Sequence, residues 1–202
     1  MTTLAATTVT FSRSAFPPLA VGFFGLGVGY LIYGAQELLG FPRRPDRKVD
    51  LATGIWGVWM PGFMQFITGV FLFVGLTWFG SFQDKPLYMA ALAFTAFGVH
   101  WWAIGMVRMM GGDPRPNAVM SIAFLVISTL GIVVFFHNGV DRPVGGVFIG
   151  LALVYISEFF ATLKFPLAER ALGFFRLGTG AWLMYLTWAV ALNFTSGYHL
   201  PV

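Results

Sequence analysis

The segment that decides the fold is Leu51–Phe79, with the sequence LATGIWGVWMPGFMQFITGVFLFVGLTWF. Its centre, Met60–Gly69, places a proline, two glycines and a glutamine in a run that is otherwise mostly apolar and aromatic. A helix needs about 20 apolar residues to cross the core of a bilayer. The segment therefore predicts a transmembrane helix with one polar side chain, Gln65, near its middle.

The composition of the whole chain agrees with a membrane environment. Of 202 residues, 57% are hydrophobic and 18% are aromatic, whereas only 12 are Lys or Arg and 8 are Asp or Glu. So few charges cannot cover the surface of a soluble globule. Apolar runs of spanning length recur at about 18–39, 51–79, 86–110, 117–137, 143–163 and 171–194. We therefore expect an all-α integral membrane protein whose six transmembrane helices form one bundle.

The segments between the apolar runs are short, so neighbouring helices should pack as antiparallel pairs. We expect a polar N-terminal tail at 1–16, a single transmembrane domain at 17–195 and a short C-terminal tail at 196–202. No soluble domain fits into these connections, which argues against a nucleic-acid-binding surface despite the net charge of +4. The chain has no Cys, so disulfide bonds and thiolate metal sites are excluded.

Basic residues gather at three of the five expected connections. The first, third and fifth connections, with their margins, hold Arg43, Arg44, Arg47, Lys48, Arg108, Arg115, Lys164, Arg170 and Arg176. The other side of the membrane receives Arg13, Lys85 and Arg142. By the positive-inside rule the larger group is cytoplasmic, which places both termini outside a multi-pass protein of the plasma membrane.

One stripe of the decisive helix differs from the rest of its surface. Its members are Pro61, Gln65, Thr68, Gly69 and Leu72, which fall on one face at helical spacing. A buried amide costs a few kcal/mol in lipid when it lacks a partner. The stripe should therefore face protein, where Gln65 either bonds a neighbouring helix or lines a pore.

Four segments, taken in order, resemble a known family. They are FPPLAVGFFGLG (Phe16–Gly27), PGFMQFITG (Pro61–Gly69), LAFTAFGVHWW (Leu92–Trp102) and GFFRLGTGAWLMYL (Gly173–Leu186). The chain resembles a divergent member of the acetate uptake transporter family, the succinate–acetate permeases. Its first segment departs from the opening motif of that family, because it lacks the asparagine and the glycine of the motif.

The resemblance implies a homohexamer in which each protomer has its own pore. The pore glutamine of the family falls on Gln65, its first-helix constriction phenylalanine on Phe24, and its third-helix constriction tyrosine on Phe97. Thr95, in the same segment as Phe97, joins the expected substrate pathway. The tyrosine hydroxyl of the family is lost at Phe97.

A second family is more distantly similar, the proton-gated urea channels and short-chain amide transporters. FGVHWWAIGMVRMMGGDPRP (Phe97–Pro116) and LKFPLAERALGFFRLGTGAW (Leu163–Trp182) resemble two of its interhelical connections. That family also has external termini, as the charge distribution predicts here. Where it has a pore glutamate, the aligned residue of this chain is Arg176, which argues against urea-like selectivity.

Ionisable residues inside the expected spans should pair with one another. Glu158 and Arg176 lie about 8 Å inside the same membrane face, so we expect an ion pair between them. Glu37 and Arg108 are near enough in depth to extend it or to snorkel to the headgroups. The pair either locks helices together, or Arg176 adds a positive field to the substrate pathway at the cytoplasmic mouth.

The three histidines show no spacing typical of a metal or haem site, so no cofactor and no metal are expected. His100 is either a packing residue or a pH-dependent gate. No acid and histidine accompany a Ser or Thr at one depth, and we do not expect an enzyme.

These observations predict a channel or transporter for a small weak acid such as acetate or another monocarboxylate. The permeant would pass a narrow aromatic-lined pore beside Gln65, where shedding water costs less for a neutral acid than for an anion. A urea or short-chain amide channel is the alternative within the same class. From another class, a structural or assembly membrane protein would have its pore closed by His100, Trp101 and Trp102.

Overall fold

The computed structural model describes residues 15–42, 45–137 and 141–202. Its elements are α1 (Phe16–Leu39), α2 (Arg47–Gly57), η1 (Val58–Phe63), α3 (Met64–Thr77), α4 (Pro86–Met110), α5 (Pro116–His137), α6 (Arg142–Thr162) and α7 (Ala168–Ser196). No strand occurs within these described ranges. The all-α prediction is confirmed. Most of the expected N-terminal tail, together with Arg13, Arg43 and Arg44, lies outside the described residues.

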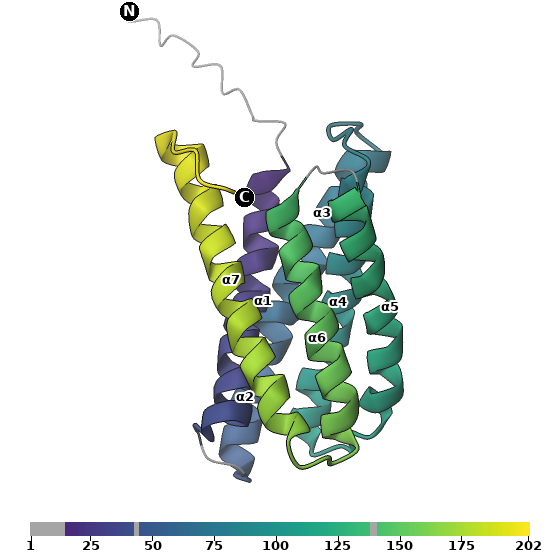
Figure 1. Cartoon of the computed structure of the whole chain (residues 1–202), viewed down its shortest axis with the longest axis vertical. Coiled ribbons are helices and arrows are strands. Elements are labelled where there is room, and N and C mark those ends of the chain that lie inside the picture. The colour runs from purple at the N-terminus through teal and green to yellow at the C-terminus, as the bar shows by residue number, and fades with distance from the viewer. Residues whose placement is uncertain (1–14, 43–44, 138–140) are drawn as a thin grey trace, which may run out of the picture.

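The helices stand side by side along the long axis of the molecule and alternate in direction (Figure 1). The elements α2, η1 and α3 follow one another without a break and form a single rod, so that six rods make up the bundle. The beginning of α1 and the end of α7 lie at one end, called here the upper end. The connections α1–α2, α4–α5 and α6–α7 lie at the opposite, lower end. This arrangement gives the antiparallel packing expected from short connections.

Five of the rods are long and apolar enough to cross a membrane. They are Pro18–Leu39, Arg47–Thr77, Pro86–Met110, Pro116–His137 and Arg142–Thr162. The remaining rod, α7, has 29 residues and runs the length of the bundle, but it carries Arg176 together with several Gly, Thr and Trp residues. We conclude that the chain is a multi-pass membrane protein.

Proline and capping residues set where the rods begin. Pro18, Pro86, Pro116 and Pro143 lie in first turns, where a missing N–H costs no helical hydrogen bond. At α2, Asp46 accepts hydrogen bonds from the backbone N–H groups of Lys48 and Val49, at 2.7 and 3.3 Å. This cap starts the second rod at Arg47, so the start expected from hydropathy at residue 51 is late.

The interior of the second rod explains the proline in its sequence. Pro61 lies in η1, a π-helical segment whose wider turns tolerate a residue without an N–H. The close approach of α1 also depends on this place, because a Cβ on Gly29 would lie 2.6 Å from the Cγ of Pro61. All five residues of the predicted stripe are buried, and this prediction is confirmed.

The C-terminal tail folds back on α7 (Figure 1). The side chain of Asn193 accepts from the backbone N–H of Leu200 and donates to its carbonyl oxygen, each at 2.8 Å. The hydroxyl of Tyr185 donates to the carbonyl of Pro201 at 3.1 Å. The upper end of α7 is thus held by its own tail.

Candidate functional site

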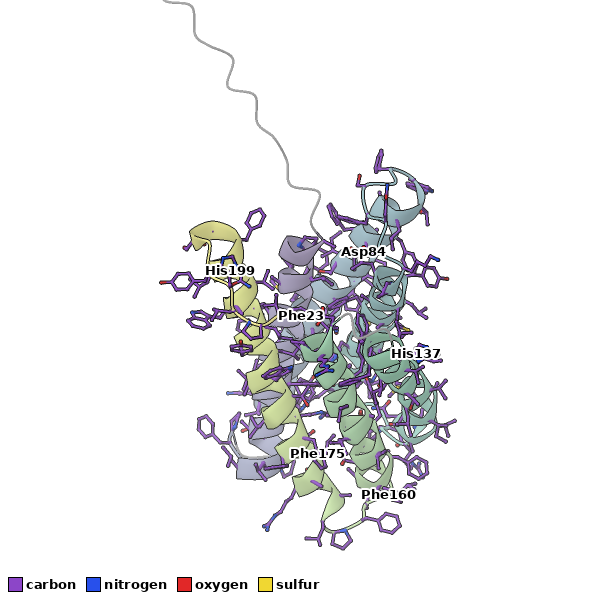
Figure 2. The ribbon with its side chains drawn as sticks, turned by 45° about the horizontal axis from the view of Figure 1, so that its top comes forward. Phe23, Asp84, His137, Phe160, Phe175 and His199 are labelled. Carbon is purple, nitrogen blue, oxygen red and sulfur yellow. The ribbon has the colours of Figure 1, made fainter. Side chains whose placement is uncertain are left out.

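A cavity of about 530 Å³ extends into the bundle from the upper end. Its apolar walls are formed by Leu19, Phe23 and Leu26 of α1, Ala90, Ala93, Phe94 and Phe97 of α4, Phe135 of α5, Val144, Val147, Phe148 and Leu151 of α6, and Leu183 of α7. Figure 2 shows Phe23 in the interior, below Asp84 at the upper end. This volume lies within the range of about 300–1,000 Å³ that is typical of small-molecule sites.

Gln65 of α3 is the one polar side chain that borders the cavity away from its upper end. It lies twelve residues before Thr77, the last residue of its rod, which places it about 18 Å below that end. The side chain is 1% exposed, and within the described residues neither its amide nitrogen nor its amide oxygen has a hydrogen-bond partner. A buried amide without partners is costly, and a ligand in the cavity could satisfy it.

The mouth of the cavity is polar and acidic. Ser81, Gln83 and Asp84 from the α3–α4 connection and Asp141 before α6 line it. Asp141 also caps α6, because its carboxylate accepts from the backbone N–H of Val144 at 2.9 Å. Partial burial raises the pKa of the Asp141 carboxyl, and this hydrogen bond opposes the rise. Two carboxyl groups at the mouth disfavour the approach of an anion.

Below the cavity the bundle is filled with aromatic side chains. The ring of Phe97 stacks on that of Tyr155 with centroids 5.7 Å apart, and the hydroxyl of Tyr155 is 3.1 Å from Nδ1 of His100. Trp101 packs on Tyr30 and, edge to face, on Tyr33, with centroid distances of 5.8 and 5.0 Å. Of these residues only Phe97 reaches the cavity wall. The group formed by Tyr30, Tyr33, His100, Trp101 and Tyr155 is called here the aromatic floor.

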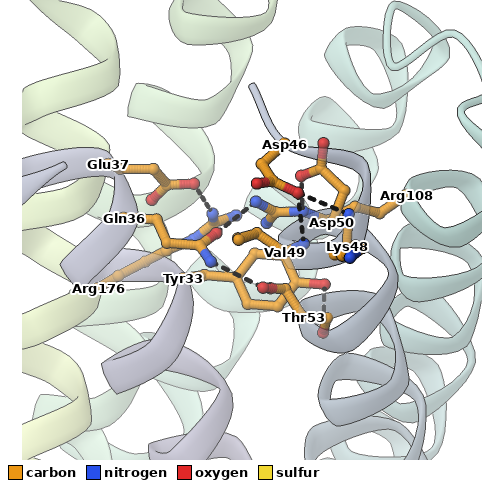
Figure 3. Close-up of polar contacts among 10 residues, drawn as sticks. All are labelled: Tyr33, Gln36, Glu37, Asp46, Lys48, Val49, Asp50, Thr53, Arg108 and Arg176. Atoms are coloured by element: carbon orange, nitrogen blue, oxygen red, sulfur yellow. Dashed lines mark hydrogen bonds and ion pairs between the residues drawn. The ribbon is translucent and has the colours of Figure 1, made fainter. Parts of the chain in front are cut away.

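An ion cluster lies beneath the aromatic floor. The guanidinium group of Arg176 donates to Glu37, and its other terminal nitrogen is 3.4 Å from a carboxylate oxygen of Glu158 (the contact to Glu37 is drawn in Figure 3). The Arg176 side chain is buried. The cluster joins α1, α6 and α7, and its ion pairs let the three charges exist away from water.

A second polar group connects α4 to α1 and α2 (Figure 3). Arg108 donates to Asp50 at 3.0 Å and to the side-chain oxygen of Gln36. The amide nitrogen of Gln36 in turn donates to the hydroxyl of Thr53 at 2.7 Å. The guanidinium groups of Arg108 and Arg176 both lie over the ring of Tyr33, at 4.7 and 5.7 Å from its centroid. The lower half of the bundle is therefore closed by aromatic and ionic contacts.

Two residues of the expected substrate pathway meet at the cavity, Gln65 and Phe97. Thr95 lies elsewhere: its hydroxyl donates to the carbonyl of Ala91 at 2.8 Å, and it packs where α3 approaches α4 at Gly69. Thr95 is not among the cavity-lining residues, because its position on α4 is about 200° around the helix from Phe97.

Phe24, the first-helix constriction residue implied by the resemblance, does not lie at this cavity. Its side chain is 40% exposed on the outside of α1, and it does not line the cavity. The preceding residue, Phe23, is 3% exposed and forms part of the wall. Two adjacent phenylalanines point about 100° apart on a helix, so only one of them can face the interior. The first-helix aromatic at the cavity is Phe23.

Of the ionisable residues expected inside the membrane, Glu158, Arg176 and His100 are buried, and Glu37 and Arg108 are partly buried. Arg176 and Glu158 form the predicted pair, and Glu37 extends it on α1. His100 belongs to the aromatic floor through Tyr155, and Trp102 packs away from it against Phe66, with ring centroids 4.8 Å apart. Arg176 does not line the cavity, so its charge is separated from Gln65 by the floor.

Sequence reasoning missed most of the cavity wall. The wall positions on α4, which include Pro86, Ala90, Ala93 and Phe97, recur at intervals of three and four residues. This spacing is a detectable signal for one helix face. It does not distinguish a face that packs from one that lines a cavity, since both are apolar in a membrane bundle.

Comparison with solved structures finds a bacterial acetate channel, SatP, with a TM-score of 0.74. The match covers 96% of this chain and 99% of the channel at 17% sequence identity. The chain has the fold of this channel. No model of a protein family matches the sequence, and no curated protein sequence matches it either.

Proposed function

We propose that this protein is a membrane channel or transporter that passes a small weak acid in its neutral form. The observation that carries the proposal is the unpaired amide of Gln65 at the inner end of an apolar cavity. The shared fold with SatP, which is described as an acetate channel, supports the same class of function.

The chemistry of an amide favours a protonated acid over its anion. A carboxylic acid can donate its O–H to the oxygen of Gln65 and accept an N–H from the nitrogen, which satisfies both groups. A carboxylate can only accept, and it would face the amide oxygen with like partial charge. The apolar walls and the acidic mouth add to this preference, because an anion must lose its hydration there without a cation beside it.

On this proposal the pathway is closed below Gln65. The aromatic floor separates Gln65 from the lower end, and the amide has almost no exposed area although its side chain borders the cavity. Passage therefore requires a movement of the floor and a small side-chain rotation at Gln65. We assign to Arg176 an anchoring role in place of a positive field in the pathway, because two carboxylates surround its guanidinium group.

The same floor favours a second candidate function, a structural membrane protein whose pore is permanently closed. The observation behind it is the burial of Tyr30 and Trp101, each 1% exposed. Urea or a short-chain amide is a further permeant to test, since an amide can also donate to and accept from Gln65. Hexameric assembly and one pore in each protomer remain predictions from the family resemblance.

We further propose that the upper end faces the outside of the plasma membrane. Arg47, Lys48, Arg115, Lys164 and Arg170 lie at the lower-end connections, as the positive-inside rule requires of a cytoplasmic face. Arg108 and Arg176 were counted with them from the sequence, but their side chains are buried in polar clusters. The remaining basic residues still make the lower end the more positively charged one.

The deciding experiment is uptake of radiolabelled acetate into proteoliposomes at acidic and neutral pH, after subtraction of uptake into protein-free vesicles. Gln65→Met removes the amide at nearly constant volume, and Ile67→Met is the matched control on the lipid-facing side of the same helix, where Ile67 is exposed. We expect faster uptake at acidic pH that is lost in Gln65→Met and kept in Ile67→Met. Absence of acetate flux, and of urea flux measured in the same vesicles, would favour the closed, structural protein.

A further inference from the structure

The cavity is larger and more apolar than acetate requires. Acetate has one methyl group, whereas the cavity has a volume of about 530 Å³. Along α4 its wall runs from Pro86 to Phe97, which corresponds to about 16 Å of helix. An occupant that fills this space needs an apolar part of several carbons.

Polar groups occur only at the two ends of this space. Gln65 borders the inner end, and Ser81, Gln83, Asp84 and Asp141 border the mouth. Every other residue assigned to the cavity wall within the described parts of the chain is apolar. A molecule with one polar head and one apolar tail matches this distribution, whereas a small polar solute would leave the walls without contacts.

The acidic mouth determines which way such a molecule enters. A carboxylate head left between Asp84 and Asp141 would be repelled by their charges. The same head placed at Gln65 can form two hydrogen bonds to the unpaired amide in its protonated form. The tail then occupies the phenylalanine-lined part, between Phe94 and Phe148.

We propose that the preferred occupant of this cavity is a small amphiphile with a planar carboxylic-acid or amide head on Gln65 and an unbranched tail of several methylene groups. The inference rests on the proposed function and narrows its substrate class. The tail would lie against Ala90 and its neighbours, and these residues would select for chain length.

Binding to purified protein in lipid nanodiscs tests the inference. Equilibrium dialysis measures the dissociation constants of radiolabelled acetate, butyrate, hexanoate and hexanamide, with empty nanodiscs as the blank for partition into lipid. The pH is set near the carboxyl pKa so that protonated acid is present. Each added methylene should tighten binding about fourfold, so that hexanoate, with four more methylene groups, binds about 250-fold more tightly than acetate.

Two variants locate the tail and the head. Ala90 lies two helical turns before Phe97, about 10 Å nearer the mouth, and Ala90→Phe fills the space of the tail. We expect it to weaken hexanoate binding about tenfold and to leave acetate within about twofold. Ala103→Phe is the control, because Ala103 is exposed on the same helix and does not line the cavity. Gln65→Met should weaken the binding of both hexanoate and hexanamide and leave the increase in affinity for each added methylene unchanged.

The outcomes separate this inference from the proposed function. Equal affinity for acetate and hexanoate overturns the inference. An increase in affinity with chain length that Ala90→Phe leaves unchanged also overturns it, because that increase would come from the lipid. The comparison of hexanoate with hexanamide shows which head is preferred, and a chain-length gain from acetate to hexanoate supports the inference. Acetate flux into proteoliposomes is measured separately. Binding of hexanoate at this site without any acetate flux would support the binding site and contradict the proposed channel function.

Discussion

Gly29 of α1 lies directly against Pro61 of η1. A Cβ added to Gly29 would come within 2.6 Å of one ring carbon of the proline and 3.1 Å of two others. The proline ring cannot move aside as a flexible side chain does. The packing of α1 on the second rod therefore requires glycine at this position.

Gly29→Ala should consequently destabilise the bundle by about 1–3 kcal/mol, the usual cost of overpacking. Gly178→Ala is the control, because nothing lies within 4 Å of a Cβ at Gly178. There we expect no loss and at most a gain of about 1 kcal/mol from better helix propensity. Thermal unfolding in detergent measures both. Equal melting temperatures for the two variants would contradict the close packing.

Gln65→Met should make the protein more stable although it abolishes uptake. The wild-type amide is buried without a partner among the described residues, and such a group costs about 1–3 kcal/mol. Methionine has nearly the same shape and no polar atoms. The measurement is the denaturation midpoint of the two proteins. A decrease would show that the amide has a stabilising partner and that the cavity is not its main neighbour.

Arg176→Met should destabilise the protein by about 3–5 kcal/mol, because it leaves Glu37 and Glu158 buried without their cation. Adding Glu37→Gln and Glu158→Gln to this variant should recover most of the loss. Arg115→Gln is the comparison: Arg115 pairs with Asp113 on the surface, and we expect no measurable change. If the single and triple variants unfold alike, the cluster is not a coupled unit.

Asp141→Asn should increase acid uptake at neutral pH more than at acidic pH, because it removes a charge that repels the anion from the mouth, where the acid takes up its proton before it passes Gln65. Burial raises the pKa of Asp141, so the wild-type carboxyl loses its charge as the pH falls through that raised value. The ionised carboxylate destabilises the folded protein relative to the neutral form. The variant should therefore also be more stable than the wild type, mainly above that pKa. Asparagine keeps the helix cap. The pH profile of acetate uptake decides this, and an unchanged profile would remove Asp141 from the mouth chemistry.

Membrane orientation can be measured with single cysteines, since the natural chain has none. Ser196 is exposed at the upper end of α7, and Glu169 is exposed near its lower end. In intact cells an impermeant maleimide should label Ser196→Cys, and it should label Glu169→Cys only after permeabilisation. The reverse pattern would place the cavity mouth in the cytoplasm.

The fold followed from the sequence because the period and length of apolar runs are set by the bilayer. The buried stripe from Pro61 to Leu72 followed for the same reason, as polar and small residues avoid lipid. The choice between Phe23 and Phe24 did not, since both are apolar aromatics and a shift of one residue leaves the hydropathy unchanged. It needed the actual rotation of α1 against its neighbours.

The ion pairs were predictable only in part. Depth alone brought Glu158 and Arg176 together, because the expected spans place both about 8 Å inside the same membrane face, and the structure pairs them. The partners of Arg108 depend on Asp46 starting α2 early, which places Asp50 beside Arg108 and Thr53 beside Gln36. Hydropathy carries no information about such a cap. The cavity itself arises from side chains that do not fill the space between the rods, and no pattern in one sequence records that.

The two guanidinium groups over Tyr33 have a mechanical consequence. Arg108 ties this ring to α4 and α2, and Arg176 ties it to α6 and α7, while the ring itself belongs to α1 and packs on Trp101. A shift of α1 large enough to move Tyr33 off Trp101 must pull the ring away from at least one cation. On the proposed function, opening would then require exchange of these cation–π contacts, and replacing Tyr33 with leucine would loosen α1 from both pairs of helices at once.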